Sequence, residues 1–317
     1  MITQKGKAIL KEKLIQKGKA IQRRKSIQKE RQVQKSRHIQ KGVRFLCLAG
    51  LAGIVCFPIL IVLCGAFCSQ WELEEKLSPV LAGTEGSAFW TLLPLAPTLA
   101  SLVELLMDLP QFFVLFWNSV KLALLIPAGQ LFFGAPAAWG LARFSFPGKR
   151  AVTAMYLILM LMPFQVMMLP QYLAIRRLHL LDTHAGMVLP AVFSTFPVFL
   201  MYRGFLELPE AVLEAAKIDG AGDLQSFLKI GIPLGRPALM SAALLGFLEA
   251  WNLIEQPMTF LKTRSLWPLS LFLPELRLSD AGLGFAVSLL MLIPALLVFL
   301  GGQEYLEQGI RAAAVKE

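Results

Sequence analysis

Charged residues are scarce in this chain of 317 residues. Lys, Arg, Asp and Glu together make up 16% of the sequence, whereas hydrophobic residues make up 56%. A soluble domain carries about 25% charged residues and roughly 45–50% apolar residues. The composition therefore excludes an ordinary soluble domain and indicates an integral membrane protein.

Cysteine is also scarce, and its four occurrences are confined to one apolar run and its edges. Since such a run forms a single helix, Cys47, Cys56, Cys64 and Cys68 could pair only with one another along it. We interpret them as small apolar packing residues rather than as disulfide or metal-binding residues. The run itself, Phe45 to Phe67, has 23 residues, whereas the apolar core of a secretory signal has about 7–15. We therefore expect it to be retained as a membrane span.

Long apolar stretches supply six candidate membrane spans. About 20 apolar residues cross a hydrocarbon core of roughly 30 Å. Proline inside the second and the last stretch is acceptable, because neighbouring membrane helices satisfy the freed backbone groups. We therefore predict an all-α polytopic membrane protein with six transmembrane helices, within a domain that covers residues 44–317. The six stretches lie near residues 45–67, 117–142, 151–170, 184–204, 237–261 and 282–302.

The distribution of Lys and Arg between the two sides of these spans predicts their orientation. The segment before the first span, the 2–3 and 4–5 connections and the C-terminus hold 24 of the 31 basic residues, against six on the opposite side. Basic residues accumulate in cytoplasmic connections. We therefore expect both termini and the 4–5 connection to be cytoplasmic, although Arg176 and Arg177 lie on the opposite side and depart from this bias.

One polar, charged stretch interrupts the apolar sequence, in the 4–5 connection at residues 205–236. Pro209 suits the first position of a helix, because it needs no backbone donor there, and helix-forming residues follow from Glu210 to Asp219. Gly220 then offers the left-handed backbone that ends a helix. A helix of this length rises only about 16 Å at 1.5 Å per residue, which is too short to cross a membrane. We expect it to lie at the membrane surface.

A second short helix is expected directly after the first. Asp223 can cap it at its N-terminus, and it would run from Leu224 to Ile230. Gly231 and Pro233 would end it, because proline cannot continue the helical hydrogen-bond pattern.

The side chains around the first helix suit the docking of a partner. Small residues allow close approach, apolar residues supply contact, and charged residues supply ion pairing. An ordinary amphipathic helix that rests on lipid headgroups is the alternative. The small residues are Ala215, Ala216 and Gly220, the apolar ones Val212, Ala216 and Phe227, and the charged ones Glu214, Lys217 and Asp219.

The stretch “EAAKIDGAGDLQSFLKIGIPLGRPAL” resembles the cytoplasmic signature of binding-protein-dependent ABC importer permeases. In that signature Glu-Ala-Ala is followed after three residues by Gly, and after nine more by Ile, one residue and Leu-Pro. Here these positions are Glu214 to Ala216, Gly220, Ile230 and Ile232-Pro233, with Ile232 in place of Leu. The form “EAAKIDGA” is typical of the carbohydrate-importing branch.

Five further segments resemble that branch in the same order along the chain. The similarity covers residues 85–317, and the chain looks most like the smaller, six-span permease of maltose-type importers. Ala313 and Glu317 stand where the family often has Gly, and the basic N-terminal extension is atypical of the family. The segments are “FWNSVKLAL”, “LARFSFPGKR”, “HLLDTHAGMVLP”, “FLEAWNLIEQPMTFL” and “EYLEQGIRAAAVKE”.

The resemblance implies an ABC importer type I permease fold in the inner or plasma membrane of a prokaryote. An extracytoplasmic solute-binding protein would deliver a carbohydrate, expected to be an oligosaccharide, to this chain and a second, different permease. Two copies of a cytoplasmic P-loop ATPase would hydrolyse ATP with Mg²⁺. The sequence contains no G-x-x-x-x-G-K-[ST] loop, so we expect ATP and Mg²⁺ on the ATPase, no cofactor in this chain, and no enzymatic activity of its own.

The same resemblance implies that the ATPase binds the signature helix in a groove on its surface. Small residues would allow close approach, and Glu214 would make a charge-assisted contact. Closure of the ATPases would push this helix and rock the spans as rigid bodies. The six implied docking residues are Glu214, Ala215, Ala216, Lys217, Asp219 and Gly220.

Five polar or aromatic residues within the predicted spans are candidates for the substrate path: Gln130, Gln165, Glu249, Trp251 and Asn252. Sugars bind aromatic faces and hydrogen-bond to amides and carboxylates, and residues 249–252 supply all three groups. Carboxylates within membranes are commonly functional. The alternative is that Glu249 faces another subunit or lies at a membrane edge.

The basic tail, residues 1–43, carries a six-residue repeat, as in “IQKGKA” and “IQRRKS”. Six residues turn a helix by about 600°, so successive apolar residues fall on three faces and form no single stripe. We expect a disordered or partly helical tail drawn to anionic lipid. A regulatory or nucleic-acid-binding arm is the alternative, but the tail lacks aromatic residues for base stacking, and we expect no nucleic acid as a partner.

Three other functions compete with carbohydrate import. An importer permease for a non-sugar solute would keep the same signature. An ion-coupled secondary transporter, with Glu249 as its proton site, would need an internal repeat, and none is evident in the sequence. A membrane anchor that displays the basic tail would leave the polar stretch at residues 205–236 unexplained.

Overall fold

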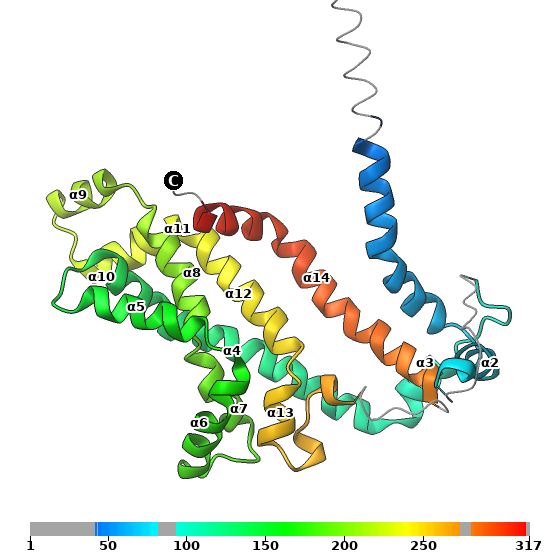
Figure 1. Cartoon of the computed structure of the whole chain (residues 1–317). Helices are drawn as coiled ribbons and strands as arrows, with labels where there is room; N and C mark the ends of the chain where they lie inside the picture. The colour runs from blue at the N-terminus through cyan, green and yellow to red at the C-terminus, as the bar shows by residue number, and fades with distance from the viewer. Residues whose placement is uncertain (1–41, 43, 82–92, 273–279, 315–317) are drawn as a thin grey trace, which may run out of the picture. The chain divides into compact units, whose positions relative to one another are not determined.

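The computed structural model describes residues 42, 44–81, 93–272 and 280–314, and every regular element in these ranges is helical (Figure 1). The chain divides into two compact units, residues 1–61 and 62–317, which we describe separately. The described part of the first unit belongs to the Arg44–Gly65 helix, whose side chains are exposed as far as Leu60. The repeat in the basic tail lies outside the described residues.

The second unit is built from helices, several of them short or bent. The longest are α4, Pro110–Arg143, and α14, Ala281–Ala314, with 34 residues each. Two segments, η1 (Glu104–Asp108) and η2 (Phe227–Gly231), are π-helical. The other elements are α2 (Gln70–Leu81), α3 (Ala100–Val103), α5 (Lys149–Met160), α6 (Phe164–Arg177), α7 (His184–Val192), α8 (Thr195–Leu206), α9 (Glu210–Ile218), α10 (Asp223–Ser226), α11 (Ile232–Leu234), α12 (Arg236–Trp251), α13 (Glu255–Phe260), η3 (Arg264–Leu266) and η4 (Leu269–Leu271).

Four helical segments are long and apolar enough to cross a membrane, and they correspond to four of the six predicted spans. Two further pairs of helices reach the necessary length only together, and each pair is bent: α5 with α6 by 106°, and Asp223–Leu234 with α12 by 72°. If each bent pair is one span, the described residues contain up to six. The prediction of an all-α membrane protein is confirmed. The four segments are Arg44–Gly65, Pro110–Arg143, His184–Leu206 and Ala281–Gln308.

The predicted spans at residues 151–170 and 237–261 are not straight helices. In the first, α5 ends at Met160, and Pro163 adopts an extended backbone before α6 begins. Proline donates no backbone hydrogen bond and disfavours helical geometry in the residue before it, so α5 cannot continue through this position. In the second, α12 ends at Trp251 and α13 begins at Glu255.

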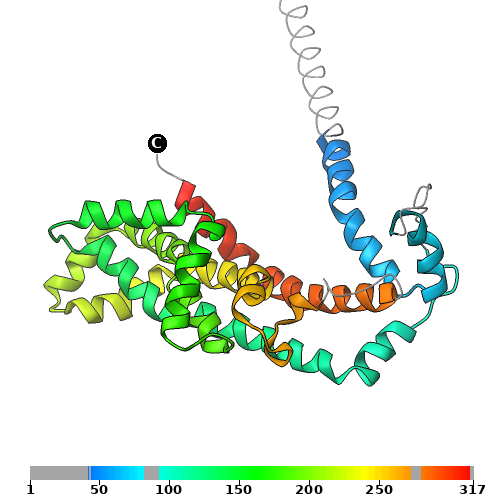
Figure 2. The ribbon, with the colours of Figure 1, turned by 60° about the horizontal axis from the view of Figure 1, so that its bottom comes forward.

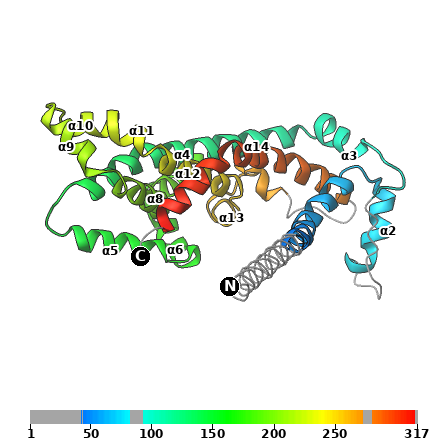
Figure 3. The ribbon, with the colours of Figure 1, turned by 90° about the horizontal axis from the view of Figure 1, so that it is seen from above.

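The core of the second unit forms around α4. This helix packs against α7, α8 and α12, and α14 runs alongside α12 (Figures 1 and 2). Close approach of α12 and α14 depends on Gly302, because a Cβ added there would lie 1.9 Å from Leu244 Cδ1. Helices α9, α10 and α11 lie together near one end of α4, and α3 lies near the other (Figure 3). The predicted surface helix is thus held at the end of the central helix.

Candidate functional site

The polar stretch of residues 205–236 folds into the exposed helix α9 and a helical return segment. Pro209 is the residue before α9 and not, as predicted, its first helical residue. Gly220, two residues after the end of α9, has φ of +80°. The amide of Gly220 donates to the carbonyl of Lys217 at 3.0 Å, and that of Ala221 donates to the carbonyl of Ala216 at 2.9 Å. These bonds satisfy carbonyls at the helix end, and the left-handed conformation predicted for Gly220 is confirmed.

The return segment differs from its prediction at both ends. Asp223 is its first helical residue, and Gly222 occupies the cap position without any side-chain hydrogen bond. The segment stays helical to Leu234, so Gly231 and Pro233 do not end it. Gly231 lies in a π-helical turn, and the helix continues from this turn through Pro233 in α11.

Most of the predicted docking residues on and directly after α9 are exposed. Ala216 is the exception, because it is buried next to the partly buried Leu213. Phe227, which we expected to contact a partner, is also buried in the core. Ile218 was not selected from the sequence, although it lies inside “EAAKIDGA”, and it is 86% exposed. The exposed members of the predicted set are Glu214, Ala215, Lys217, Asp219 and Gly220.

The α9 loop, which we define as residues 205–236, is attached to one turn of α4 on both sides of α9. Trp139 contacts Phe205, which lies before α9, with ring centres 5.3 Å apart, and Phe227, which lies after α9, at 5.7 Å. Gly231 packs beneath the same indole, since an added Cβ would lie 2.7 Å from Trp139 Cζ3. One turn further, Arg143 donates hydrogen bonds to the carbonyls of Phe205 and Leu208. The last turn of α4 therefore holds the loop on both sides.

A cavity of about 490 Å³ lies between α4, the bent pair of α5 and α6, α7, α8, α12 and α13. Its walls are mostly aliphatic, methionine and phenylalanine side chains, with a few hydrogen-bonding groups among them. The combination of an apolar surface and a small number of polar groups is typical of small-molecule sites. The polar groups belong to Gln130, Gln171, Ser194, Thr195, Glu249 and Gln256.

The structure brings together two of the five predicted substrate-path residues, Gln130 and Glu249, in this cavity. Trp251 is 1% exposed and belongs to the core, where its indole N–H donates to the Met291 carbonyl at 3.0 Å. Asn252 donates to the carbonyl of Leu248 in its own helix. Gln165 donates to the exposed Glu255 at 3.0 Å, and neither residue lines the cavity.

Three glutamines of the cavity wall share an unusual feature: the Oε1 atoms of Gln130, Gln171 and Gln256 are buried without a hydrogen-bond partner. The orientation of Gln130 is fixed, because its Nε2 donates to the Ala191 carbonyl at 3.0 Å. Buried acceptors without partners are costly and uncommon in proteins. Gln171 and Gln256 were not selected from the sequence, although an amide in an apolar stretch is the signal that selected Gln130.

Two connections are joined at Asp182, between α6 and α7. Its carboxylate accepts hydrogen bonds from the backbone N–H groups of Lys262 and Thr263, each at 2.8 Å, and from the Thr263 hydroxyl at 2.6 Å. The hydroxyl and these two amides hold the pKa of Asp182 below its ordinary value. Asp182 has φ of +59°, an uncommon backbone that this clamp stabilises. It ties the α6–α7 connection to the segment after α13.

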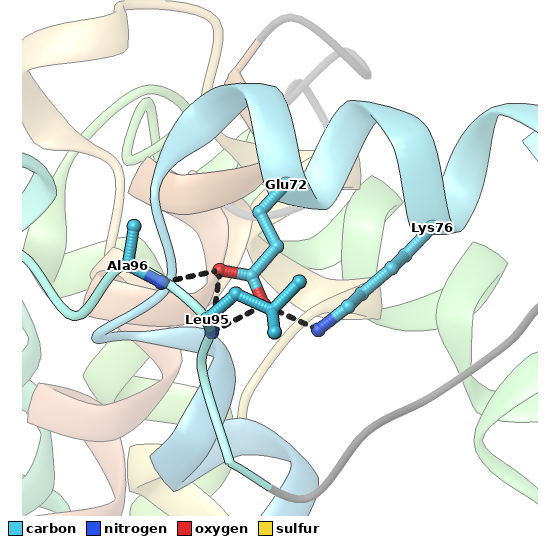
Figure 4. Close-up of polar contacts among 4 residues, drawn as sticks. All are labelled: Glu72, Lys76, Leu95 and Ala96. Atoms are coloured by element: carbon cyan, nitrogen blue, oxygen red, sulfur yellow. Dashed lines mark hydrogen bonds and ion pairs between the residues drawn. The ribbon is translucent and has the colours of Figure 1, made fainter.

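A second carboxylate clamp lies on α2 (Figure 4). Glu72 is 1% exposed; it accepts the amide of Leu95 at 3.0 and 3.2 Å and that of Ala96 at 3.4 Å. It also pairs with Lys76 Nζ at 2.5 Å. Burial raises the pKa of Glu72, but the hydrogen bonds from Lys76 and the two amides outweigh burial and lower it overall. Glu72 thus holds the chain at residues 93–96 against α2.

Comparison with known proteins identifies relatives over most of the chain. Residues 130–312 match the family described as binding-protein-dependent transport system inner membrane component. A probable ABC transporter permease protein of Pyrococcus horikoshii is 33% identical over 238 residues, which cover 73% of this chain and 86% of the relative. The arabinooligosaccharides transport system permease protein of Bacillus subtilis is 32% identical over 209 residues, which cover 65% and 74% of the two chains.

A solved structure shares the fold. A chain of a bacterial ABC transporter involved in the import of the acidic polysaccharide alginate superposes with a TM-score of 0.72. The match covers 85% of this chain and 97% of the other, at 24% sequence identity. The chain therefore shares its overall fold with this solved structure.

Proposed function

Because the chain belongs to the family of binding-protein-dependent transport system inner membrane components, and is a permease subunit of an ABC importer, we propose that it carries a carbohydrate, an oligosaccharide in particular, across a prokaryotic cell membrane. It would form half of the translocation path with a second permease, a different chain. The observation that carries the proposal is the α9 loop. There the signature residues Glu214 to Gly220 form a helix whose outer face is exposed.

The docking of a cytoplasmic ATPase is the proposed role of α9. Ala215 and Gly220 leave room for close approach, and Glu214, Lys217 and Asp219 present charges on the exposed surface. Two copies of a P-loop ATPase would engage the two permeases and supply the free energy. This assignment places α9 and both termini in the cytoplasm, with the solute-binding protein on the opposite side, as the bias of Lys and Arg predicts.

A carbohydrate substrate is supported by the relatives and by the internal cavity. The permease of Bacillus subtilis is named for arabinooligosaccharides, and the transporter with the similar fold is described as importing alginate. The cavity wall of this chain offers amides, hydroxyls and one carboxylate, which can exchange hydrogen bonds with sugar hydroxyls. We assign Gln130 and Glu249 to the substrate path, and add Gln171 and Gln256 to it.

Mass spectrometry of the proteins that co-purify with this chain from its native membrane tests the proposal. We expect a P-loop ATPase and a second permease at a fixed ratio, together with a solute-binding protein whose ligand identifies the carbohydrate. Recovery of the chain alone, in a detergent that keeps other importers intact, would refute the proposed assembly. A binding protein specific for a non-sugar solute would refute the substrate but leave the assembly standing.

A further inference from the structure

Arg143, the last residue of α4, has a role that the signature does not assign. Its Nη2 atom donates to the carbonyl of Phe205 and, at 2.9 Å, to that of Leu208. The Phe205 carbonyl lies in the last turn of α8, and the Leu208 carbonyl lies in the connection that follows α8. Arg143 therefore fixes the three-residue connection, Glu207 to Pro209, that leads into α9.

The position of Arg143 relative to Trp139 extends this attachment to both ends of the α9 loop. The two residues are four positions apart on α4, so their side chains lie on one face. The guanidinium carbon lies 5.8 Å from the centre of the Trp139 ring, which is within the range of a cation–π contact. Since Trp139 contacts Phe227 beyond α9, one turn of α4 carries both attachments of the loop.

The body of α9 itself is only loosely joined to the rest of the protein. A cavity of about 450 Å³ lies beside it, lined by Trp139 and Arg143 of α4, by Glu210, Glu214 and Lys217 of α9, and by Asp223 of the return segment. On α9, Ala216 is buried and Leu213 is partly buried, whereas its other side chains are exposed. A force on α9 therefore reaches the core chiefly through the attachments at its two ends.

We propose that Arg143 is the positioning residue that transmits displacement of α9 to α4 and α8, an inference that rests on the proposed docking of the ATPase at α9. One terminal nitrogen of the guanidinium, Nη2, donates to both carbonyls, while the planar group keeps its charge over the aromatic ring of Trp139. Lysine keeps the charge but offers a single ammonium on a flexible stem. Without Arg143, α9 still binds the ATPase, but the connection before it keeps only the Trp139–Phe205 contact, and displacement of α9 reaches α4 and α8 less completely.

The test compares Arg143→Ala and Arg143→Lys in the complete importer, purified with its ATPase and binding protein and reconstituted in vesicles. Arg150→Ala is the matched control, because Arg150 is exposed in the same α4–α5 region. We expect Arg143→Ala to retain the ATPase and its hydrolysis of ATP, while solute uptake per ATP falls at least tenfold. In Arg143→Lys, solute uptake per ATP should fall less than in Arg143→Ala. In Arg150→Ala, it should stay within twofold of that of the unaltered complex.

Spin labels provide a second readout that does not depend on transport. The labels replace Val212 on α9 and Ala137 on α4, both exposed, in a chain whose four cysteines are changed to alanine. We expect Arg143→Ala to broaden the distribution of distances between them, and Arg143→Lys to broaden it less.

The proposal is overturned if the distance distribution stays narrow in Arg143→Ala, or if its uptake per ATP stays within twofold of the control. A parallel fall of hydrolysis and uptake, with loss of the ATPase, also overturns it, since Arg143 would then only maintain the fold. If the unaltered complex shows no ATP-driven uptake, the proposed function fails. The spin labels then decide separately whether Arg143 anchors α9.

Discussion

Removal of the Glu72 carboxylate is expected to release the chain at residues 93–96 from α2. Glu72 is the common acceptor for Lys76 Nζ and the amides of Leu95 and Ala96, and these three donors lose it together in Glu72→Ala (Figure 4). Breaking a buried ion pair by removing one partner costs about 3–5 kcal/mol. Local release of residues 93–96 lets water reach Lys76, so we expect a smaller cost, about 1.5–3 kcal/mol, as for hydrogen bonds to a charged group.

Amide hydrogen exchange measures this cost locally, because protected amides exchange through local opening. At about 1.36 kcal/mol per factor of ten, the expected loss corresponds to exchange roughly 10- to 150-fold faster at Leu95 and Ala96. The neighbouring exposed Glu75 provides the control, and Glu75→Ala should change this rate less than twofold. Peptides from the centre of α4 should keep their protection in both variants.

The double variant Glu72→Gln with Lys76→Met separates the ion pair from the rest of the clamp. The single variant Glu72→Gln removes the carboxylate that pairs with the Lys76 ammonium, whereas the double variant removes both charges. Replacement of both partners of a buried pair is far less costly than removal of one. We therefore expect exchange in the double variant to lie closer to that of the unaltered chain. Equal exchange in all variants would refute the reasoning that this clamp holds residues 93–96.

The pH dependence of the clamp follows from the lowered pKa of Glu72. The folded pKa lies below the unfolded value of about 4.3, so the carboxylate contributes its full stability above that pH. The contribution is lost as the pH falls through the folded pKa, because protonation removes the charge that pairs with Lys76. The difference in thermal unfolding midpoint between the unaltered chain and Glu72→Gln should accordingly shrink as the pH is lowered below about 4.

Three further predictions concern α9, the cavity and the Asp182 clamp. Gly220→Asp should abolish ATP-coupled uptake, because the new side chain enters open space at the proposed docking surface and φ of +80° strains any residue other than glycine there, whereas membrane insertion should persist. Gly222→Asp, at an open position with φ of −71°, controls for the added charge, and normal uptake by Gly220→Asp would exclude docking at this position. In a transport assay, Glu249→Gln should lower uptake several-fold at subsaturating solute, whereas Gln165→Ala, outside the cavity, should leave uptake unchanged. If the two variants change uptake equally, Glu249 does not belong to the substrate path. Asp182→Ala should accelerate amide exchange in the peptide after α13, since it removes the acceptor of the Lys262 and Thr263 N–H groups; unchanged exchange would contradict the clamp.

The bounds of helix α9 could be predicted from the sequence because the residues that set them act locally. Pro209 has no backbone N–H and therefore cannot continue a helix from the residues before it. Gly220 adopts a left-handed backbone conformation that is strained for other residues. Both backbone effects depend only on the residue itself and its immediate neighbours. The helix bounds therefore agree within one residue at each end, from Glu210 to Ile218.

Proline within the spans shows why the bent helices could not be predicted in the same way. Pro127 and Pro136 remain inside α4, whereas Pro163 separates α5 from α6 by a bend of 106°. The surroundings differ: α4 is enclosed by α7, α8 and α12, but α5 has no buried residue within this chain. Neighbouring helices can satisfy the groups that proline leaves unpaired. The outcome is set by tertiary packing, which the sequence of one segment does not contain.

The substrate path shows the same division between local and tertiary information. Residue chemistry drew attention to Trp251 and Asn252 together with Glu249, since all three lie within one turn of α12. Neighbouring positions on a helix point in different directions, so only Glu249 reaches the cavity while Trp251 enters the core. Gln171 and Gln256 reach the same cavity from α6 and α13, whose positions depend on the two interrupted spans.

Helix α4 connects the two sites to which the proposed function assigns substrate binding and ATPase docking. Gln130 of α4 lines the internal cavity, and Arg143 of the same helix holds the root of α9. Thirteen residues at 1.5 Å each separate them by about 20 Å along an unbroken helix. Coupling between distant sites needs a contiguous element on which both act. A displacement of α9 that is passed on by Arg143 moves the helix that forms the cavity wall, so transmission through this chain needs no relay beyond α4 itself.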